Sequence, residues 1–140
     1  MTLPLWMLLG FPSWTLMVLA AGVGVSRWLL IFKGAAQLTS FPGGVPHGSP
    51  AYRRATRAHA NCVETLPVFA AIVLTAATAH LSPAYFDRLA VVTFAARIPQ
   101  TLVHTLLPLT NASIGVRFTL FMVQAVAMTA MAVLLAMAAA

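Results

Sequence analysis

Charged residues are scarce in this 140-residue chain, where Asp, Glu, Lys and Arg together make up 7% of the sequence. Only two residues are acidic, Glu64 and Asp87. Soluble domains are about a quarter charged, and hydrophobic residues here reach 61%, so a water-soluble globule and a disordered chain are both excluded. The single cysteine, Cys62, excludes an intrachain disulfide and a cysteine-based metal site.

The net charge of +6 comes from eight lysines and arginines that are scattered along the chain. They do not form a basic stripe with interleaved aromatic residues, so nucleic-acid binding is not expected. The sequence contains no His-x-x-x-His or Glu-x-x-His pair, so no metal site is expected either. The composition instead predicts an integral membrane protein.

Four apolar segments are long enough to cross a bilayer, which takes about 20 mostly apolar residues. None shows sustained strict alternation, so we expect an all-α, polytopic four-helix bundle rather than a barrel. The first segment carries no charge before Arg27, which favours a retained helix over a signal peptide. Its glycines, Gly22 and Gly24, predict small packing positions. The single membrane domain 1–140 would hold helices at about 4–32, 59–80, 84–108 and 115–138.

Basic residues gather around the loop that joins the first two segments. They are Arg27, Lys33, Arg53, Arg54 and Arg57. By the positive-inside rule, loop 33–57 is predicted to be cytoplasmic and both termini to lie on the opposite side. We expect a multi-pass protein of a bacterial inner membrane. The short connections at 80–84 and 109–113 predict antiparallel neighbours.

Polar residues within the apolar segments recur at helical spacing, so those of one segment share a helix face. The second segment carries Arg54, Arg57, Asn61 and Glu64. The third carries Arg97, Gln100, Thr101 and His104, and the fourth carries Arg117 and Gln124. By the predicted topology, all three stripes lie toward the cytoplasmic leaflet.

Two interpretations of these stripes remain open. In the structural one, Glu64 neutralises an arginine such as Arg97, and Asn61 and Gln100 hydrogen-bond helices to one another. In the functional one, the arginines outnumber the single carboxylate and leave a positive pocket suited to a ligand with carboxylates. Cys62 is predicted to be an inert buried thiol.

The run from Arg54 to Pro67 reads R-x-x-R-A-H-x-N-x-x-E-x-x-P. It resembles the second-helix signature of the MAPEG family, the membrane-associated proteins in eicosanoid and glutathione metabolism. The resemblance covers essentially the whole chain, strongly at 54–67, moderately at 94–104 and 114–124, and weakly over the first segment. It implies a microsomal glutathione transferase-like homotrimer, with glutathione as co-substrate bound between neighbouring subunits.

The resemblance also implies the residues of the site. Glutathione would be held by Arg54, Arg57, Asn61, Glu64, Arg97 and His104. Its two carboxylates suit arginines, and its ammonium suits Glu64. Arg117, expected in the first turn of the fourth helix, and His104 are the catalytic candidates; many members place a tyrosine where His104 stands. Alternatively, Arg117 reaches to the membrane interface. No first-helix contact has a clear match, and Arg27 and Lys33 are the candidates.

Three functions are compatible with these features. The first is a glutathione transferase or peroxidase that acts on lipophilic electrophiles arriving through the bilayer. The second is a non-catalytic scaffold of the same fold that binds glutathione or lipid. The third is a small proton-coupled drug transporter. Its mechanism requires a carboxylate deep in the membrane, typically in the first helix, and the first segment contains no acidic residue, which disfavours this function.

Overall fold

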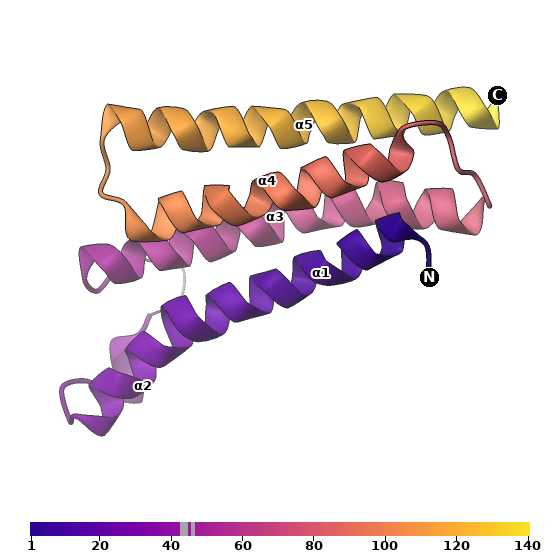
Figure 1. Cartoon of the computed structure of the whole chain (residues 1–140). Helices are drawn as coiled ribbons and strands as arrows, with labels where there is room; N and C mark the ends of the chain where they lie inside the picture. The colour runs from indigo at the N-terminus through magenta and orange to yellow at the C-terminus, as the bar shows by residue number, and fades with distance from the viewer. Residues whose placement is uncertain (43–44, 46) are drawn as a thin grey trace.

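The computed structural model describes residues 1–42, 45 and 47–140, and its long elements are helices (Figure 1). The first helical run joins α1 (Leu3–Val18), the π-helix η1 (Leu19–Gly24) and α2 (Val25–Phe32). A short 3-10 turn, η2, follows at Leu38–Ser40. The remaining helices are α3 (Pro50–Thr78), α4 (Phe86–Leu106) and α5 (Asn111–Ala139).

Four helical runs are long and apolar enough to span a membrane: Leu3–Phe32, Pro50–Thr78, Phe86–Leu106 and Asn111–Ala139. The predicted all-α, four-span membrane fold is therefore confirmed. The helices run antiparallel, so both termini lie at one end of the bundle (Figure 1). The opposite end, called the loop end below, is formed by α2, the start of α3, the end of α4 and the start of α5.

Two helices begin earlier than the apolar pattern predicts, because polar caps extend them beyond their apolar parts. The α3 helix begins at Pro50, where the Ser49 hydroxyl accepts a hydrogen bond from the Tyr52 amide at 3.2 Å. The α5 helix begins at Asn111, where Thr110 and Ser113 form a reciprocal capping box. Both extensions lie at the loop end, and the α3 extension places Arg53, Arg54 and Arg57 on a helix there.

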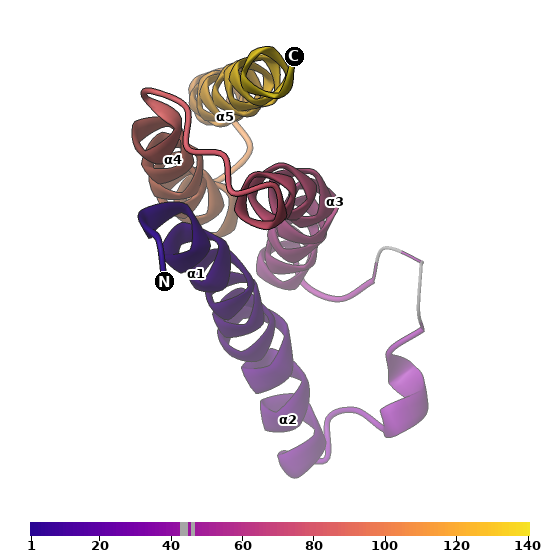
Figure 2. The same cartoon turned by 90° about the vertical axis from the view of Figure 1, so that its right-hand side faces the viewer.

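The four spans do not pack equally. The α4 helix contacts α1, α3 and α5, whereas α5 packs chiefly against α4. The main core joins Phe11 of α1, Phe69 of α3 and Met131 of α5, all fully buried. The α2 helix diverges from the bundle (Figure 2) and contains no buried residue. Large apolar side chains are exposed around the bundle, as a lipid-facing surface requires.

The π-helix η1 is a feature that the apolar pattern did not predict. It packs closely against α3, since a Cβ on Gly22 would lie 2.9 Å from the Ala55 Cβ. A Cβ on Gly24 would meet only the Leu19 carbonyl oxygen at 3.6 Å, which is ordinary contact. The predicted small packing position is therefore confirmed at Gly22, while Gly24 has room.

We expect Gly22→Ala to destabilise the protein by about 1–3 kcal/mol, because neither backbone at this crossing has a flexible side chain that can yield. Gly24→Ala is the matched control: its methyl has space, and alanine is favoured over glycine in helices by up to about 1 kcal/mol. Thermal unfolding in detergent measures both variants. Equal midpoints for the two variants would contradict the close approach of η1 to α3.

Candidate functional site

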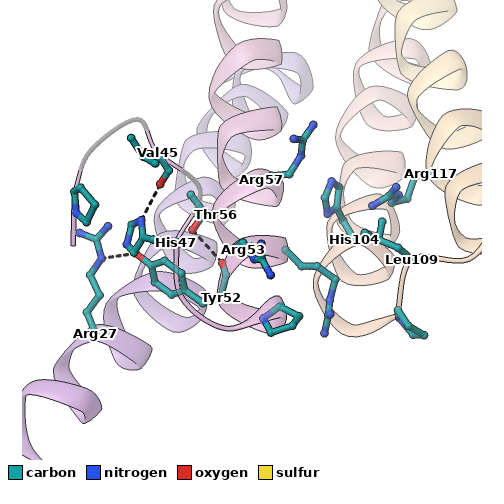
Figure 3. A pocket seen from close by; sticks show the side chains of 14 residues that line it. Arg27, Val45, His47, Tyr52, Arg53, Thr56, Arg57, His104, Leu109 and Arg117 are labelled. Carbon is teal, nitrogen blue, oxygen red and sulfur yellow. Dashed lines mark hydrogen bonds between the residues drawn. The ribbon is translucent and has the colours of Figure 1, made fainter. Parts of the chain in front are cut away.

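A cavity of about 850 Å³ opens at the loop end of the bundle (Figure 3). Side chains from α2, the 33–49 loop, α3, α4 and α5 line it. Its charged and titratable lining residues are Arg27, Arg53, Arg54, Arg57, Arg117, His47 and His104. No acidic residue is among the lining residues in the part of the chain that is described. The cavity is therefore strongly positive and suited to an anion.

Two arginines enter the cavity from α3 on the predicted polar face. The Arg54 Nε donates a hydrogen bond to the Thr105 carbonyl at 3.2 Å, which ties the start of α3 to the end of α4. Arg57 lies one helical turn further along, is exposed, and projects from α3 toward the side where α4 and α5 lie (Figure 3). The predicted stripe thus supplies two guanidinium groups to the cavity.

His104 and Arg117 face the cavity from the other side (Figure 3). Both are half-buried, and the His104 Nδ1 is buried without a described hydrogen-bond partner. The sequence predicted Arg117 in the first turn of the fourth helix. Because α5 begins at Asn111, Arg117 lies in its second turn instead. The field of a helix N-terminus fades within the first turn, so the helix dipole contributes little at Arg117.

Three residues expected in the site do not line the cavity. Glu64 is exposed on the outer face of α3, and Asn61 is half-buried on the same helix. Arg97 is fully buried inside the bundle. Its Nη1 and Nη2 donate to neutral groups on Gln100 and Thr65. The structural interpretation in which Glu64 neutralises Arg97 is therefore wrong within this chain.

Arg97 is the centre of a buried polar network that joins three helices. Its Nη1 donates to the Gln100 Oε1 at 2.7 Å and its Nη2 to the Thr65 Oγ1 at 2.6 Å. The guanidinium also lies 5.3 Å from the centre of the Phe11 ring, a favourable cation–π distance. Its Nε has no described partner.

Gln100 extends this network to α5, as its predicted interhelical role requires. Its Oε1 also accepts from the Gln124 Nε2 at 2.9 Å, and its Nε2 donates to the Arg117 carbonyl at 3.0 Å. Gln100 and Gln124 are both buried. The network therefore fixes the backbone of α5 at the residue whose side chain lines the cavity.

Cys62 is also buried, as predicted, and its Sγ lies 3.6 Å from the Thr101 Oγ1. The Thr101 hydroxyl donates to the Arg97 carbonyl at 2.8 Å, so the thiol is the donor to Thr101. Within the described residues, no group of three or more His, Cys, Asp or Glu side chains could hold a metal ion.

The part of the cavity near α2 is lined by residues outside the run from Arg54 to Pro67, among them Arg27, His47 and Tyr52. The Arg27 Nε donates to the Tyr52 hydroxyl at 2.6 Å. The Arg27 guanidinium lies 5.2 Å from the Phe41 ring centre and 5.7 Å from that of Tyr52. The His47 ring lies 5.1 Å from the Tyr52 ring. These contacts fix α2 and the loop to the start of α3. From the sequence, Arg27 was one of two candidates for a first-helix contact with the ligand, whereas Arg53 was noted only as a charge near the loop.

The fold and the cavity together define a four-span integral membrane protein with an arginine-rich site at one end. A model of the MAPEG family matches residues 11–137. The chain belongs to the MAPEG family. Searches of curated proteins and of solved structures gave no match.

Proposed function

We propose that the protein is a glutathione-dependent membrane enzyme similar to the microsomal glutathione transferases. It would act as a transferase or a peroxidase on lipophilic electrophiles. The observation that carries the proposal is a cavity with five arginines and no acidic residue among its described lining residues, in a chain of the MAPEG family. Glutathione offers that cavity two carboxylates and a thiol that can ionise. Guanidinium groups pair strongly with carboxylates, and they stabilise a thiolate.

The roles follow from position in the cavity. Arg54 and Arg57 bind the glutathione carboxylates, and Arg117 lies beside the sulfur together with His104. The lipophilic electrophile reaches the thiolate from the bilayer, since the spans that surround the cavity expose apolar side chains. No metal is required, because the thiolate itself is the nucleophile.

A homotrimer is part of the proposal and explains the exposed Glu64. A carboxylate within a membrane span is costly unless it is paired or faces a polar cavity, yet Glu64 faces outward from its own chain. In a trimer with shared sites, this face of α3 meets a neighbouring copy. Glu64 and Asn61 would then bind the glutathione ammonium and backbone at the subunit boundary, with buried Arg97 supporting the site indirectly.

We also propose that the loop end is cytoplasmic and that both termini lie on the opposite side of a bacterial inner membrane. The support is the charge distribution: Arg27, Lys33, Arg53, Arg54 and Arg57 all surround the 33–57 loop. This orientation gives the cavity direct access to cytoplasmic glutathione.

The second candidate is a non-catalytic scaffold that binds glutathione or lipid. The observation that favours it is His104, which occupies the position where many members of the family have a tyrosine contacting the ligand. A proton-coupled transporter is less favoured, because Glu64 lies on the outer surface of α3 and the first helical run has no acidic residue.

Calorimetric titration of glutathione into detergent-solubilised protein tests the proposal. We expect binding at millimolar ligand or below, and we expect Arg57→Ala to weaken it about ten- to hundredfold, because a charge-assisted contact is lost. Arg88→Ala is the matched control, since Arg88 lies at the opposite end of the bundle against the Tyr85 ring. Absence of binding at millimolar glutathione would favour the scaffold.

A further inference from the structure

The cavity must contain an acceptor for a proton, because the glutathione thiol loses one before its sulfur attacks an electrophile. In the proposed function, on which this step rests, Arg117 stabilises the thiolate. A guanidinium is always protonated and cannot accept a further proton, which excludes all five lining arginines. No described lining residue carries a carboxylate. The remaining titratable lining residues are His47, Tyr52 and His104.

Two of these three residues are engaged on the α2 side of the cavity. The Tyr52 hydroxyl accepts from the Arg27 Nε at 2.6 Å, and a phenol that keeps its hydrogen is a weak base. The His47 Nδ1 lies 2.8 Å from the Val45 carbonyl, which can only accept, so Nδ1 carries a hydrogen. The His47 Nε2 is buried. Neither side chain presents a free basic atom toward Arg117.

His104 presents such an atom. Its Nδ1 is buried, whereas its Nε2 is not among the buried polar atoms in the described part of the chain. Since the ring lines the cavity, Nε2 is the nitrogen that a ligand can reach. With the hydrogen on Nδ1, Nε2 offers a lone pair. In Figure 3, His104 and Arg117 lie on one side of the cavity and His47 and Tyr52 on the other.

We propose that His104 is the base that takes the proton of the glutathione thiol and returns it to the product. The S–H bond breaks, its electron pair stays on sulfur, and the proton binds the Nε2 lone pair. With an α,β-unsaturated carbonyl compound as electrophile, the thiolate bonds to the β-carbon and the double-bond electrons move to form an enolate. The enolate takes the proton from Nε2, which regenerates neutral His104 and leaves the glutathione conjugate.

The charges around His104 couple this transfer to glutathione binding. The charged and titratable residues that face it come from α2, the loop, α3 and α5: Arg27, His47, Arg53, Arg54, Arg57 and Arg117. The two glutathione carboxylates offset part of this positive charge. The thiolate that forms beside the imidazolium is a further opposite charge, and a neighbouring opposite charge favours the charged form of a group. The imidazolium therefore forms in the occupied cavity.

Counting protons tests the proposal without relying on turnover. Glutathione is titrated into detergent-solubilised protein near neutral pH, in two buffers of different ionisation enthalpy. The difference in heat gives the protons released on binding. S-Methylglutathione has no thiol hydrogen, so its titration gives the protons that all other groups release. Ultraviolet absorbance of the same samples gives the amount of thiolate formed.

The wild-type protein is expected to form the thiolate and to release almost none of the thiol proton, because His104 keeps it. His104→Gln keeps a polar side chain that cannot accept a proton. This variant is expected to release about one proton to the buffer for each thiolate formed, and its turnover is expected to fall about a hundredfold or more. His47→Gln is the matched control within the same cavity, and we expect it to keep the wild-type proton count.

Three results would overturn the proposal. The first is a wild-type protein that releases about one proton per thiolate, because the solvent then takes the proton. The second is glutathione that binds to the wild type as the thiol. The third is an unchanged proton count in a His104→Gln variant whose circular dichroism and unfolding midpoint match the wild type. Added imidazole is expected to restore part of the turnover of His104→Gln, which would not occur if the variant were merely misfolded.

The two ligands also keep this proposal separate from the proposed function. If neither glutathione nor S-methylglutathione binds, the glutathione function itself fails. If both bind and the thiol proton appears in the buffer, the cavity is a glutathione site and only the role of His104 is rejected.

Discussion

Gln100→Leu is expected to destabilise the bundle by about 3–5 kcal/mol, the usual range when a buried charge loses its partner. The Gln100 side chain accepts from the Arg97 Nη1 and donates to the Arg117 carbonyl. Leucine can do neither, so a fully buried guanidinium loses an acceptor and α5 loses a bond to α4. Equilibrium unfolding in detergent, followed by circular dichroism, measures the loss.

Arg97→Met is expected to change stability far less, by about 1 kcal/mol or less in either direction. Its partners keep other bonds: the Gln100 Oε1 still accepts from Gln124 at 2.9 Å, and the Thr65 hydroxyl still donates to the Asn61 carbonyl at 2.9 Å. The substitution also removes a buried charge that has no carboxylate partner among the described residues, and such a removal is often neutral or favourable. Methionine sulfur packs well against aromatic rings such as Phe11.

The variant that carries both Arg97→Met and Gln100→Leu completes a double-mutant cycle. In the Arg97→Met background, Gln100→Leu no longer leaves a guanidinium unpaired, so its cost is expected to fall to about 1–3 kcal/mol, the range for neutral hydrogen-bonding groups. A cost of Gln100→Leu that is the same in both backgrounds would contradict the charge argument. So would an Arg97→Met variant as unstable as Gln100→Leu.

Arg117→Ala is expected to raise the pH at which glutathione bound to the protein forms its thiolate. A cysteine thiol has a pKa of about 8.5, and a neighbouring cation lowers the pKa of an acidic group by about 1–3. Removing the cation should therefore reduce the thiolate fraction at neutral pH, and with it turnover, about tenfold or more. Glutathione affinity should change only modestly.

Ultraviolet absorbance of the bound thiolate across a pH titration measures this effect directly. Arg57→Ala is the control, because it is expected to weaken affinity while leaving the thiolate titration of saturated protein in place. If the Arg117→Ala titration overlays that of the wild type, thiol activation belongs to another group. His104 is then the next candidate, because its ring lines the same cavity and its buried Nδ1 has no hydrogen-bond partner in the described part of the chain.

The lengths of the apolar segments predicted the spans, and helical spacing grouped polar residues that include four of the cavity residues, because spacing determines which residues share a face. Spacing does not determine which neighbouring helix, or which cavity, that face meets at each depth along the bundle. Arg97 and His104 lie on one face of α4 but are separated by seven residues, or about 10 Å along the axis. His104 reaches the cavity at the loop end, whereas Arg97 lies inside the bundle among α1, α3 and α4.

Two other differences have physical causes that a single sequence does not reveal. The polar face of α3 includes Glu64, but which of its residues meet another helix depends on how the helices pack: Arg54 and Arg57 line the cavity, whereas Glu64 is exposed. Arg27 follows the π-helix η1, in which the extra residue per turn rotates the rest of the helix. Ordinary α-helical spacing therefore does not give the direction of Arg27.

The shared position of the two termini, at the end remote from the cavity, makes covalent concatemers practicable (Figure 1). The end of α5 in one copy can be joined to the start of α1 in the next by a linker that never crosses the bilayer or covers the arginines. Three copies in one polypeptide then allow a single Glu64→Gln or Arg57→Ala substitution per assembly. Placing the two substitutions in the same repeat or in adjacent repeats reveals whether one site draws these residues from one subunit or from two.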